Sequence, residues 1–417
     1  MPHRHAAILL ILIALSVALG IASGWVFGPA MMKVEWIGKL FLDALKMLVV
    51  PLLVAAVVTG VASLGDVRKL GRLGGLTLVY FVATTGIAVL IGLIMVNLIR
   101  PGEGLHFETP EISQAIAAKG EMGWTDIIDA LISPNLIDAA AKTEVLPLIL
   151  FSIVLSAALT TLGRAGESVL AVFNGLNEAL MKVVTWLMYL APVGIFALIA
   201  ARLGKAGGGA AMVEQIRAVG LHVVTVLSGL GLHLAVLIAV LFVLGRRGLP
   251  YIVGLMRALL TAFGTASSTA TLPLTMECAK EQGVDSRAVK FVIPLGSTVN
   301  MNGTALYEAA AAMFIAQAYG LHMSLGHQAV IFVTATLAAV GAPGIPEAGI
   351  VTMVIVLKAV GLPIEGVGLL LAVDWFLDRF RTMINVWGDA VGAAVIARFL
   401  PGDGADHGAN GESRAGG

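Results

Sequence analysis

The stretch 370–399, LLAVDWFLDRFRTMINVWGDAVGAAVIARF, places charged side chains inside a segment that is otherwise apolar. Counted from Asp378, the polar residues recur at −4, +3, +4, +7 and +11, which puts them on one face of an α-helix. They are Asp374, Asp378, Arg381, Thr382, Asn385 and Asp389. A charged side chain at mid-bilayer costs about 2.5–3.5 kcal/mol, so such residues face a polar cavity or one another. Because one arginine cannot neutralise three carboxylates, the stripe predicts a buried site that suits cations and an ammonium group.

The composition indicates that this polar stripe lies inside a lipid bilayer. Of 417 residues, 58% are hydrophobic and only 12% are charged, whereas soluble domains carry about 25% charged residues. The chain is therefore predicted to be a polytopic membrane protein. Its net charge of zero argues against a nucleic-acid partner, and a single cysteine excludes an internal disulfide framework. The first apolar run, residues 6–26, is longer than a secretory signal core and is expected to be a retained helix.

Earlier apolar segments predict further helices over residues 6–27, 36–64, 76–98, 168–200 and 219–244. The region 127–162 is interrupted by Pro134 and Pro147 and is expected to form short helical pieces. Basic residues follow the apolar segments that end at residues 64, 162 and 244, and acidic ones fall in the loop 100–125; the break after residue 200, with Arg202 and Lys205, is also basic and mildly contradicts this pattern. The positive-inside rule then places both termini in the cytoplasm, with a disordered, glycine-rich tail at 401–417.

Two later stretches carry helix breakers at their middle: TAFGTASSTATLP (261–273) and AAVGAPGIPEAG (338–349). Irregular backbone at membrane depth survives only inside protein or along a cavity, so the stretches predict two re-entrant helical hairpins. Each precedes a related motif, NMNGT (300–304) and NVWGD (385–389), which indicates an internal repeat. Gly303 and Gly388 are expected to allow local unwinding, so that carbonyls join side-chain oxygens around a hard cation such as sodium.

These motifs, in this order, resemble the dicarboxylate/amino acid:cation symporters, the family that includes glutamate and aspartate transporters. The resemblance implies an all-α polytopic membrane protein with eight transmembrane helices, two re-entrant hairpins and inverted repeats. It further implies a homotrimer in the plasma (inner) membrane that works as an elevator. Residues 1–75 and 101–204 would form the scaffold with the external loop, and 76–100 and 205–400 the transport domain.

The resemblance also implies a substrate site. Arg381 resembles the arginine that holds the side-chain carboxylate of the substrate, and Asp378 resembles the carboxylate that binds its amino group. The other implied members are Ser267, Ser268, Thr304, Gly344, Thr382 and Asn385. Arg379 resembles an arginine of the animal branch that replaces one on the first hairpin, where this chain has Ala266.

Three sodium sites are implied in the same way. The first comprises Gly296, Asn300, Asn385 and Asp389, the second Thr298, Met301 and carbonyls of the second hairpin, and the third Thr84, Thr85, Asn300 and Asn302. The family motif has Asp where this chain has Asn302, so the third site is expected to be weakened or lost. Glu308 resembles a glutamate linked to proton co-transport, and an ordinary buried hydrogen bond is an equal alternative. No cofactor is expected besides co-transported sodium and, through Glu308, a proton.

The resulting hypothesis is a non-enzymatic, sodium-coupled symporter whose partners are an acidic amino acid (L-aspartate or L-glutamate), sodium ions and the lipid bilayer. Asp378 and Asp389 favour it over the alternative, a proton-coupled C4-dicarboxylate or glutamate symporter, because such carriers commonly lack both acids. A channel and an intramembrane hydrolase are further alternatives. His222 and His233 have no second ligand at metal spacing and are expected to be core histidines with satisfied hydrogen bonds.

Overall fold

The computed structural model describes residues 3–63, 71–105, 131–142, 144–205, 209–341 and 348–400, and these ranges contain helices and no β-strand. The α-helices are α1 (His3–Phe27), α2 (Glu35–Ala62), α3 (Gly71–Ile99), α6 (Leu136–Lys142), α7 (Val145–Thr160), α8 (Arg164–Lys205), α9 (Gly209–Val240), α10 (Leu249–Thr265), α11 (Ser268–Glu281), α12 (Ser286–Val299), α13 (Asn302–Ala318), α14 (Leu325–Ala338), α15 (Ala348–Ala359) and α16 (Val367–Phe399). Short 3₁₀ or π segments are η1 (Gly28–Val34), η3 (Leu241–Gly245), η4 (Ala339–Gly341) and η5 (Ile364–Gly366).

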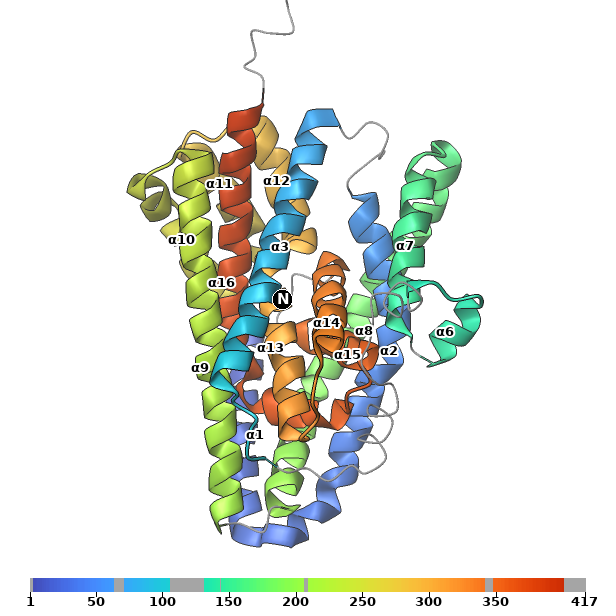
Figure 1. Ribbon diagram of the computed structural model, residues 1–417, viewed down its shortest axis with the longest axis vertical. Helices are drawn as coiled ribbons and strands as arrows, with labels where there is room; N and C mark the ends of the chain where they lie inside the picture. The colour runs from blue at the N-terminus through green and yellow to red at the C-terminus, as the bar shows by residue number, and fades with distance from the viewer. Residues whose placement is uncertain are drawn as a thin grey trace, which may run out of the picture.

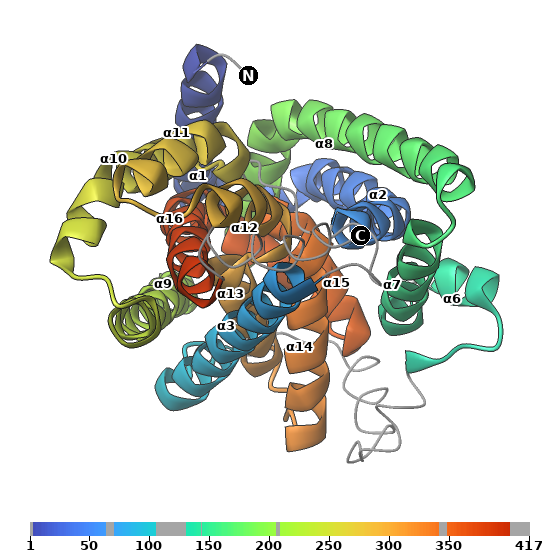
Figure 2. The ribbon, with the colours of Figure 1, turned by 90° about the horizontal axis from the view of Figure 1, so that it is seen from above.

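The helices form two packed groups that lie side by side (Figures 1 and 2). In the first group, α8 packs along α1 and α2, and α7 packs on α2. In the second group, α16 contacts α9, α10, α11, α12, α13 and α3, so it runs through the middle of the later half of the chain. The polar stripe of α16 is therefore enclosed by other helices and not exposed to lipid.

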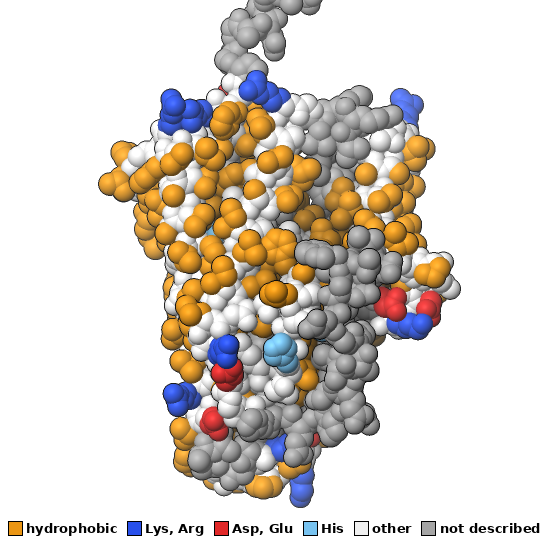
Figure 3. Space-filling view, viewed as in Figure 1, with side chains coloured by type: hydrophobic (Ala, Val, Ile, Leu, Met, Phe, Trp, Pro, Cys, Tyr) orange, Lys and Arg blue, Asp and Glu red, His pale blue; other side chains and the backbone are white. Residues whose placement is uncertain are grey.

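Long apolar helices support a multi-pass membrane protein. Among the described residues, Ile11–Ala62, Gly71–Ile99 and Val213–Gly245 are long and apolar enough to cross a bilayer. The bent pair Arg164–Leu187 and Tyr189–Lys205 makes a fourth if it counts as one span. Hydrophobic side chains cover the upper and middle part of the face in Figure 3, and Lys and Arg gather at its upper edge. The expected number of eight membrane helices stays a prediction.

Both predicted hairpins appear as pairs of packed helices. The first is α10 and α11, joined at Ala266 and Ser267, and the second is α14 and α15. At the first tip Ala266 has a left-handed backbone (φ +48°), and the Ser267 hydroxyl accepts a hydrogen bond from the Ala270 amide at 3.2 Å, capping α11. The tip of the second hairpin, residues 342–347 with Gly344, lies outside the described residues.

The expected unwinding occurs in only one of the two repeated motifs. The chain leaves helical geometry between α12 and α13, at Asn300 (ψ +60°) and Met301 (ψ +66°), just before Gly303. The prediction for Gly388 is wrong, because α16 continues through it from Val367 to Phe399. Glycine at 388 instead allows close packing, because a Cβ there would lie 2.9 Å from the side-chain nitrogen Nδ2 of Asn302.

Helix α12 offers a test of local stability away from the polar stripe. Its N-cap is Asp285, whose carboxylate accepts a hydrogen bond from the Arg287 amide at 2.7 Å. Hydrogen bonding to Arg287 lowers the pKa of Asp285 below its usual 3.8. The cap therefore stabilises the fold above that pH and loses its effect as the pH falls through the lowered pKa.

We expect Asp285→Ala to lower the stability of the protein by about 1 kcal/mol at pH 7, and the difference from the unmodified protein to shrink at pH 3. Thermal unfolding of the purified protein in detergent at both pH values measures this, with Ser286→Ala as control. An equal loss at both pH values would show that the carboxylate is not the cap.

Candidate functional site

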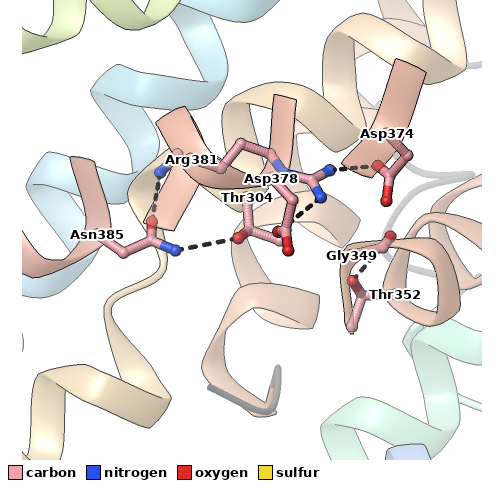
Figure 4. A network of polar contacts seen from close by, with 8 residues as sticks. Thr304, Gly349, Thr352, Asp374, Asp378, Arg381 and Asn385 are labelled. Atoms are coloured by element: carbon pink, nitrogen blue, oxygen red, sulfur yellow. Dashed lines mark hydrogen bonds and ion pairs between the residues drawn. The ribbon is translucent and has the colours of Figure 1, made fainter. Parts of the chain in front are cut away.

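Arg381 lies at the centre of the polar stripe with its guanidinium completely buried. Nη1 pairs with Asp374 Oδ1 and Nη2 with Asp378 Oδ1, both at 2.8 Å (Figure 4). The guanidinium carbon also lies 4.0 Å from the ring centroid of Tyr307 on α13. Both arms of the arginine thus pair with carboxylates of its own helix, while its Nε is buried with no hydrogen-bond partner among the described residues. The planar guanidinium can hold a ligand carboxylate in the same way where the ligand replaces one of these partners.

Two glycines make room for this arginine where helices cross. A Cβ on Gly349, near the start of α15, would lie 2.9 Å from Arg381 Nη1. A Cβ on Gly303 would lie 2.6 Å from the carbonyl oxygen of Arg381. Close approach of α13 and α15 to α16 therefore requires the absence of side chains at these two positions.

Asn385 connects the broken helix to α16. Its Oδ1 accepts a hydrogen bond from the Gly303 amide at 2.7 Å, and its Nδ2 donates to Thr304 Oγ1 at 3.2 Å (Figure 4). Thr382 is buried one helical turn before Asn385 on the same helix. The break at Asn300 and Met301 is thus held one helical turn from Arg381, and Thr304 and Asn385, two of the predicted substrate-site residues, are in contact.

The first hairpin is tied to the same part of α16. Arg379 donates from Nη1 to the carbonyls of Phe263 (3.0 Å) and Gly264 (2.9 Å), in the last turn of α10. Ser267 and Ser268 are buried at the tip. Arg379 therefore contacts the first hairpin, the element that carries Ala266, and the hairpin with both serines packs against the helix that carries Arg381.

A second polar cluster lies where α3, the α12–α13 break and α16 meet. Asn300 donates from Nδ2 to Asp389 Oδ1 at 3.0 Å, and Thr84 donates to Asn300 Oδ1 at 3.3 Å. A Cβ on Gly296 would lie 2.2 Å from Asp389 Oδ1, so α12 and α16 are in close contact there. Carboxylate, amide and hydroxyl oxygens are ligands that hard cations prefer. Among the described residues no group of three or more His, Cys, Asp or Glu side chains could hold a metal ion.

Asn302 lies within this cluster. Thr85 donates to its Oδ1 at 2.8 Å, while its Nδ2 is buried with no hydrogen-bond partner among the described residues. Tyr80 of α3, which the sequence did not single out, donates to the carbonyl of Gly388 at 2.8 Å. Asp389 is thus the carboxylate available to this cluster, and Asn302 brings an amide oxygen instead of a second charge.

The second predicted cation site is only partly visible. Met301 is buried at the helix break, and the Thr298 hydroxyl donates to the Leu295 carbonyl at 3.1 Å. Helix α12, which carries Thr298, packs against η4 at the end of the second hairpin's first arm. The other implied members are carbonyls of the second hairpin, whose residues 342–347 lie outside the described part of the chain.

Other polar residues differ from the expectation or were missed. His222 and His233 are buried on α9, but neither ring nitrogen of either has a hydrogen-bond partner among the described residues, so the expected satisfied hydrogen bonds are absent. Glu308 is fully buried on α13. Tyr307 was missed, although an aromatic residue in the alanine-rich run 304–318, directly before Glu308, was a usable signal.

The sequence matches the sodium:dicarboxylate symporter family over residues 9–399. An excitatory amino acid transporter of Caenorhabditis elegans is 36% identical over 95% of this chain and 88% of its own. Excitatory amino acid transporter 4 of Mus musculus is 38% identical over 94% of this chain and 83% of its own, and transporter 3 of the same species is 38% identical over 87% and 78%. With this match over residues 9–399, the chain belongs to the sodium:dicarboxylate symporter family, a family of membrane transporters.

Proposed function

We propose that this protein is a secondary active symporter that carries an acidic amino acid, L-aspartate or L-glutamate, into the cell together with sodium ions. The observation that carries the proposal is Arg381, a buried guanidinium paired with Asp374 and Asp378, which a substrate carboxylate would bind by replacing one of these partners. Asp378 would bind the ammonium group of the substrate, and the tip of the first hairpin its α-carboxylate. The excitatory amino acid transporters named above support the same substrate class.

Asn385 supports coupling between the substrate and the cations. It bonds the backbone of Gly303 and the hydroxyl of Thr304, immediately after the break that carries Asn300. A cation held by Asn300 and Asp389 would order the same break, so each ligand would favour the conformation that binds the other. Sodium ions are cargo in this scheme, and the sites proposed for them are those predicted from the sequence.

The two packed groups of helices support a division of the protein into a scaffold and a transport domain. The group of α1, α2, α7 and α8 would be the scaffold, and the group built around α16 would carry the substrate across the membrane by an elevator motion. We further propose a homotrimer in the plasma (inner) membrane with both termini in the cytoplasm. Glu308 stays a candidate proton carrier in this scheme because it is buried on α13 beside Tyr307.

Uptake into proteoliposomes tests the proposed function. The purified protein should accumulate radiolabelled L-aspartate or L-glutamate when sodium is high outside, and should not do so with a proton gradient alone. Accumulation driven by protons without sodium would establish a proton-coupled dicarboxylate or glutamate symporter instead. Flux that neither saturates nor accumulates substrate would indicate a channel.

Gly349→Ala is expected to weaken substrate binding about tenfold. The new methyl group would lie 2.9 Å from Arg381 Nη1 and push the guanidinium from its position, and overpacking of this kind costs about 1–3 kcal/mol. Isothermal titration with L-aspartate in saturating sodium measures the loss. Gly220→Ala in α9, where a Cβ would meet nothing within 4 Å, is the control and should leave the affinity unchanged.

A further inference from the structure

Three arginines lie together at the edge of the molecule where α16 ends (Figure 1). Arg246 and Arg247 belong to the connection from η3 to α10. Arg398 lies in the last turn of α16 and donates from Nη1 to the carbonyl of Leu244 at 2.8 Å. Its guanidinium therefore contacts the chain two residues before Arg246, and these three residues form the arginine cluster.

The positive charge of the arginine cluster is not neutralised within the described part of the chain. None of the ion pairs among the described residues involves its three members. The two carboxylates closest to it in the turn between α11 and α12 have other partners. Glu281 pairs with Arg257, and Asp285 pairs with Arg287. The cluster thus offers three cations to a ligand.

Main-chain contacts fix the position of the cluster. Arg247 donates from Nη1 and Nη2 to the carbonyls of Gln282 (2.8 Å) and Gly283 (2.7 Å), which holds the guanidinium without neutralising it. Arg246 has a left-handed backbone (φ +48°), a conformation that is costly for a residue with a Cβ and favours glycine. The positive-inside rule requires only basic residues on the cytoplasmic side, so it does not account for an arginine held in this conformation.

Exposed apolar side chains continue from the cluster along α10. Leu249, Val253, Met256 and Leu260 follow one another at spacings of four, three and four residues, which places them on one face of the helix. Their exposed fractions lie between 41% and 70%. From residue 249 to residue 260 the helix rises about 17 Å, which is close to half of the hydrocarbon core of a bilayer, or about 15 Å. This apolar row of α10 therefore matches the depth of one leaflet.

We propose that the arginine cluster binds the headgroup phosphate of an anionic phospholipid whose acyl chains lie along the apolar row of α10. Such a lipid carries negative charge at one end and hydrocarbon at the other, as the two adjoining surfaces require. Arginine suits the headgroup because its planar fork makes paired hydrogen bonds to phosphate oxygens. With the termini in the cytoplasm, as proposed above, the end of α16 faces the inner leaflet, which is rich in anionic lipids.

The experiment measures how short-chain phospholipids raise the Tm of the purified full-length protein in a non-ionic detergent. Dioctanoyl phosphatidylglycerol is the anionic probe, and dioctanoyl phosphatidylcholine is the zwitterionic one. A lipid that binds the folded protein raises its Tm with a concentration dependence that gives the Kd. We expect a saturable rise with phosphatidylglycerol and none with phosphatidylcholine or with inorganic phosphate.

Substitutions assign the effect to the cluster. Arg246→Gln should weaken phosphatidylglycerol binding about fivefold, because one basic residue beside an anionic headgroup contributes about that factor. Arg246→Lys keeps the charge and should retain most of the affinity. Arg164→Gln is the matched control, since it removes one exposed cation at the start of α8, in the other group of helices, and should leave the Kd unchanged.

Four results would overturn the proposal. Equal stabilisation by both phospholipids would show unspecific lipid binding, and an equal rise with inorganic phosphate would show a small-anion site that does not use the apolar row. Equal weakening by Arg246→Gln and Arg164→Gln would show an effect of overall charge alone. Binding that appears only after removal of residues 401–417 would show that this acidic segment occupies the cluster. None of these measurements depends on transport, so each outcome leaves the proposed function intact.

Discussion

Replacing Arg381 with glutamine, together with Asp374→Asn, is expected to weaken binding of L-aspartate and L-glutamate at least about 100-fold. In this structure the guanidinium pairs with Asp374 and Asp378. A substrate carboxylate that takes the place of these partners would receive charge-assisted hydrogen bonds worth about 1.5–3 kcal/mol each, which a glutamine cannot make. The second substitution keeps the site at a net charge of −1. Without it, two buried aspartates would lose their counter-ion, which costs about 3–5 kcal/mol and threatens the fold.

Competition binding with acidic and neutral amino acids measures the change in the Arg381→Gln/Asp374→Asn variant. Asp378 remains to hold the ammonium group, so the affinity for neutral amino acids should fall much less than that for acidic ones. Arg398→Gln is the control, because Arg398 is exposed and donates to carbonyls of Val243 and Leu244 far along α16. If acidic and neutral substrates lost affinity equally, Arg381 would be a structural residue and not the carboxylate-binding group.

The sequence predicted the stripe of α16 because helical periodicity is a local property. Every member of the stripe, from Asp374 to Asp389, is buried against other helices. This agrees with the free-energy cost of exposing charged side chains to lipid, from which the burial was predicted. The hairpins were predictable for a similar reason, since Gly and Pro in the middle of apolar runs leave few alternatives. The pairing of Arg381 with both Asp374 and Asp378 follows from spacings of −7 and −3 on one helix.

Contacts between residues far apart in the chain could not be predicted from the sequence. The stacking of Tyr307 on Arg381 and the bond from Tyr80 to Gly388 depend on how α13 and α3 cross α16. Gly388 is the clearest example of a feature that the sequence did not decide. The two related motifs, at 300–304 and 385–389, predicted unwinding at both glycines, but the helix is broken only before Gly303. A glycine permits either unwinding or close packing, and the packing of Asn302 against Gly388 selected the second.

Asn302→Asp is expected to add a sodium ion to the transport cycle. Asn302 lies with Thr85, Thr84 and Asn300 in a buried cluster to which Asp389 supplies the carboxylate. A cation in water loses its hydration shell on entering such a cluster, and one carboxylate among neutral oxygens compensates for a single charge better than for two. A carboxylate at position 302 would supply the second charge while keeping the bond from Thr85.

The result should appear as a steeper dependence of uptake on sodium concentration and as a higher accumulation limit. For each sodium ion added to the cycle, a tenfold sodium gradient raises the limiting substrate ratio about tenfold, equivalent to about 1.4 kcal/mol. Reversal-potential or limiting-accumulation measurements in proteoliposomes compare Asn302→Asp with the unmodified protein. Asn97→Asp, the same change near the far end of α3 where Asn97 bonds Gln328, is the control. An unchanged stoichiometry in Asn302→Asp would mean that the amide at 302 already serves the cation, so that the missing charge does not decide how many sodium ions the protein carries.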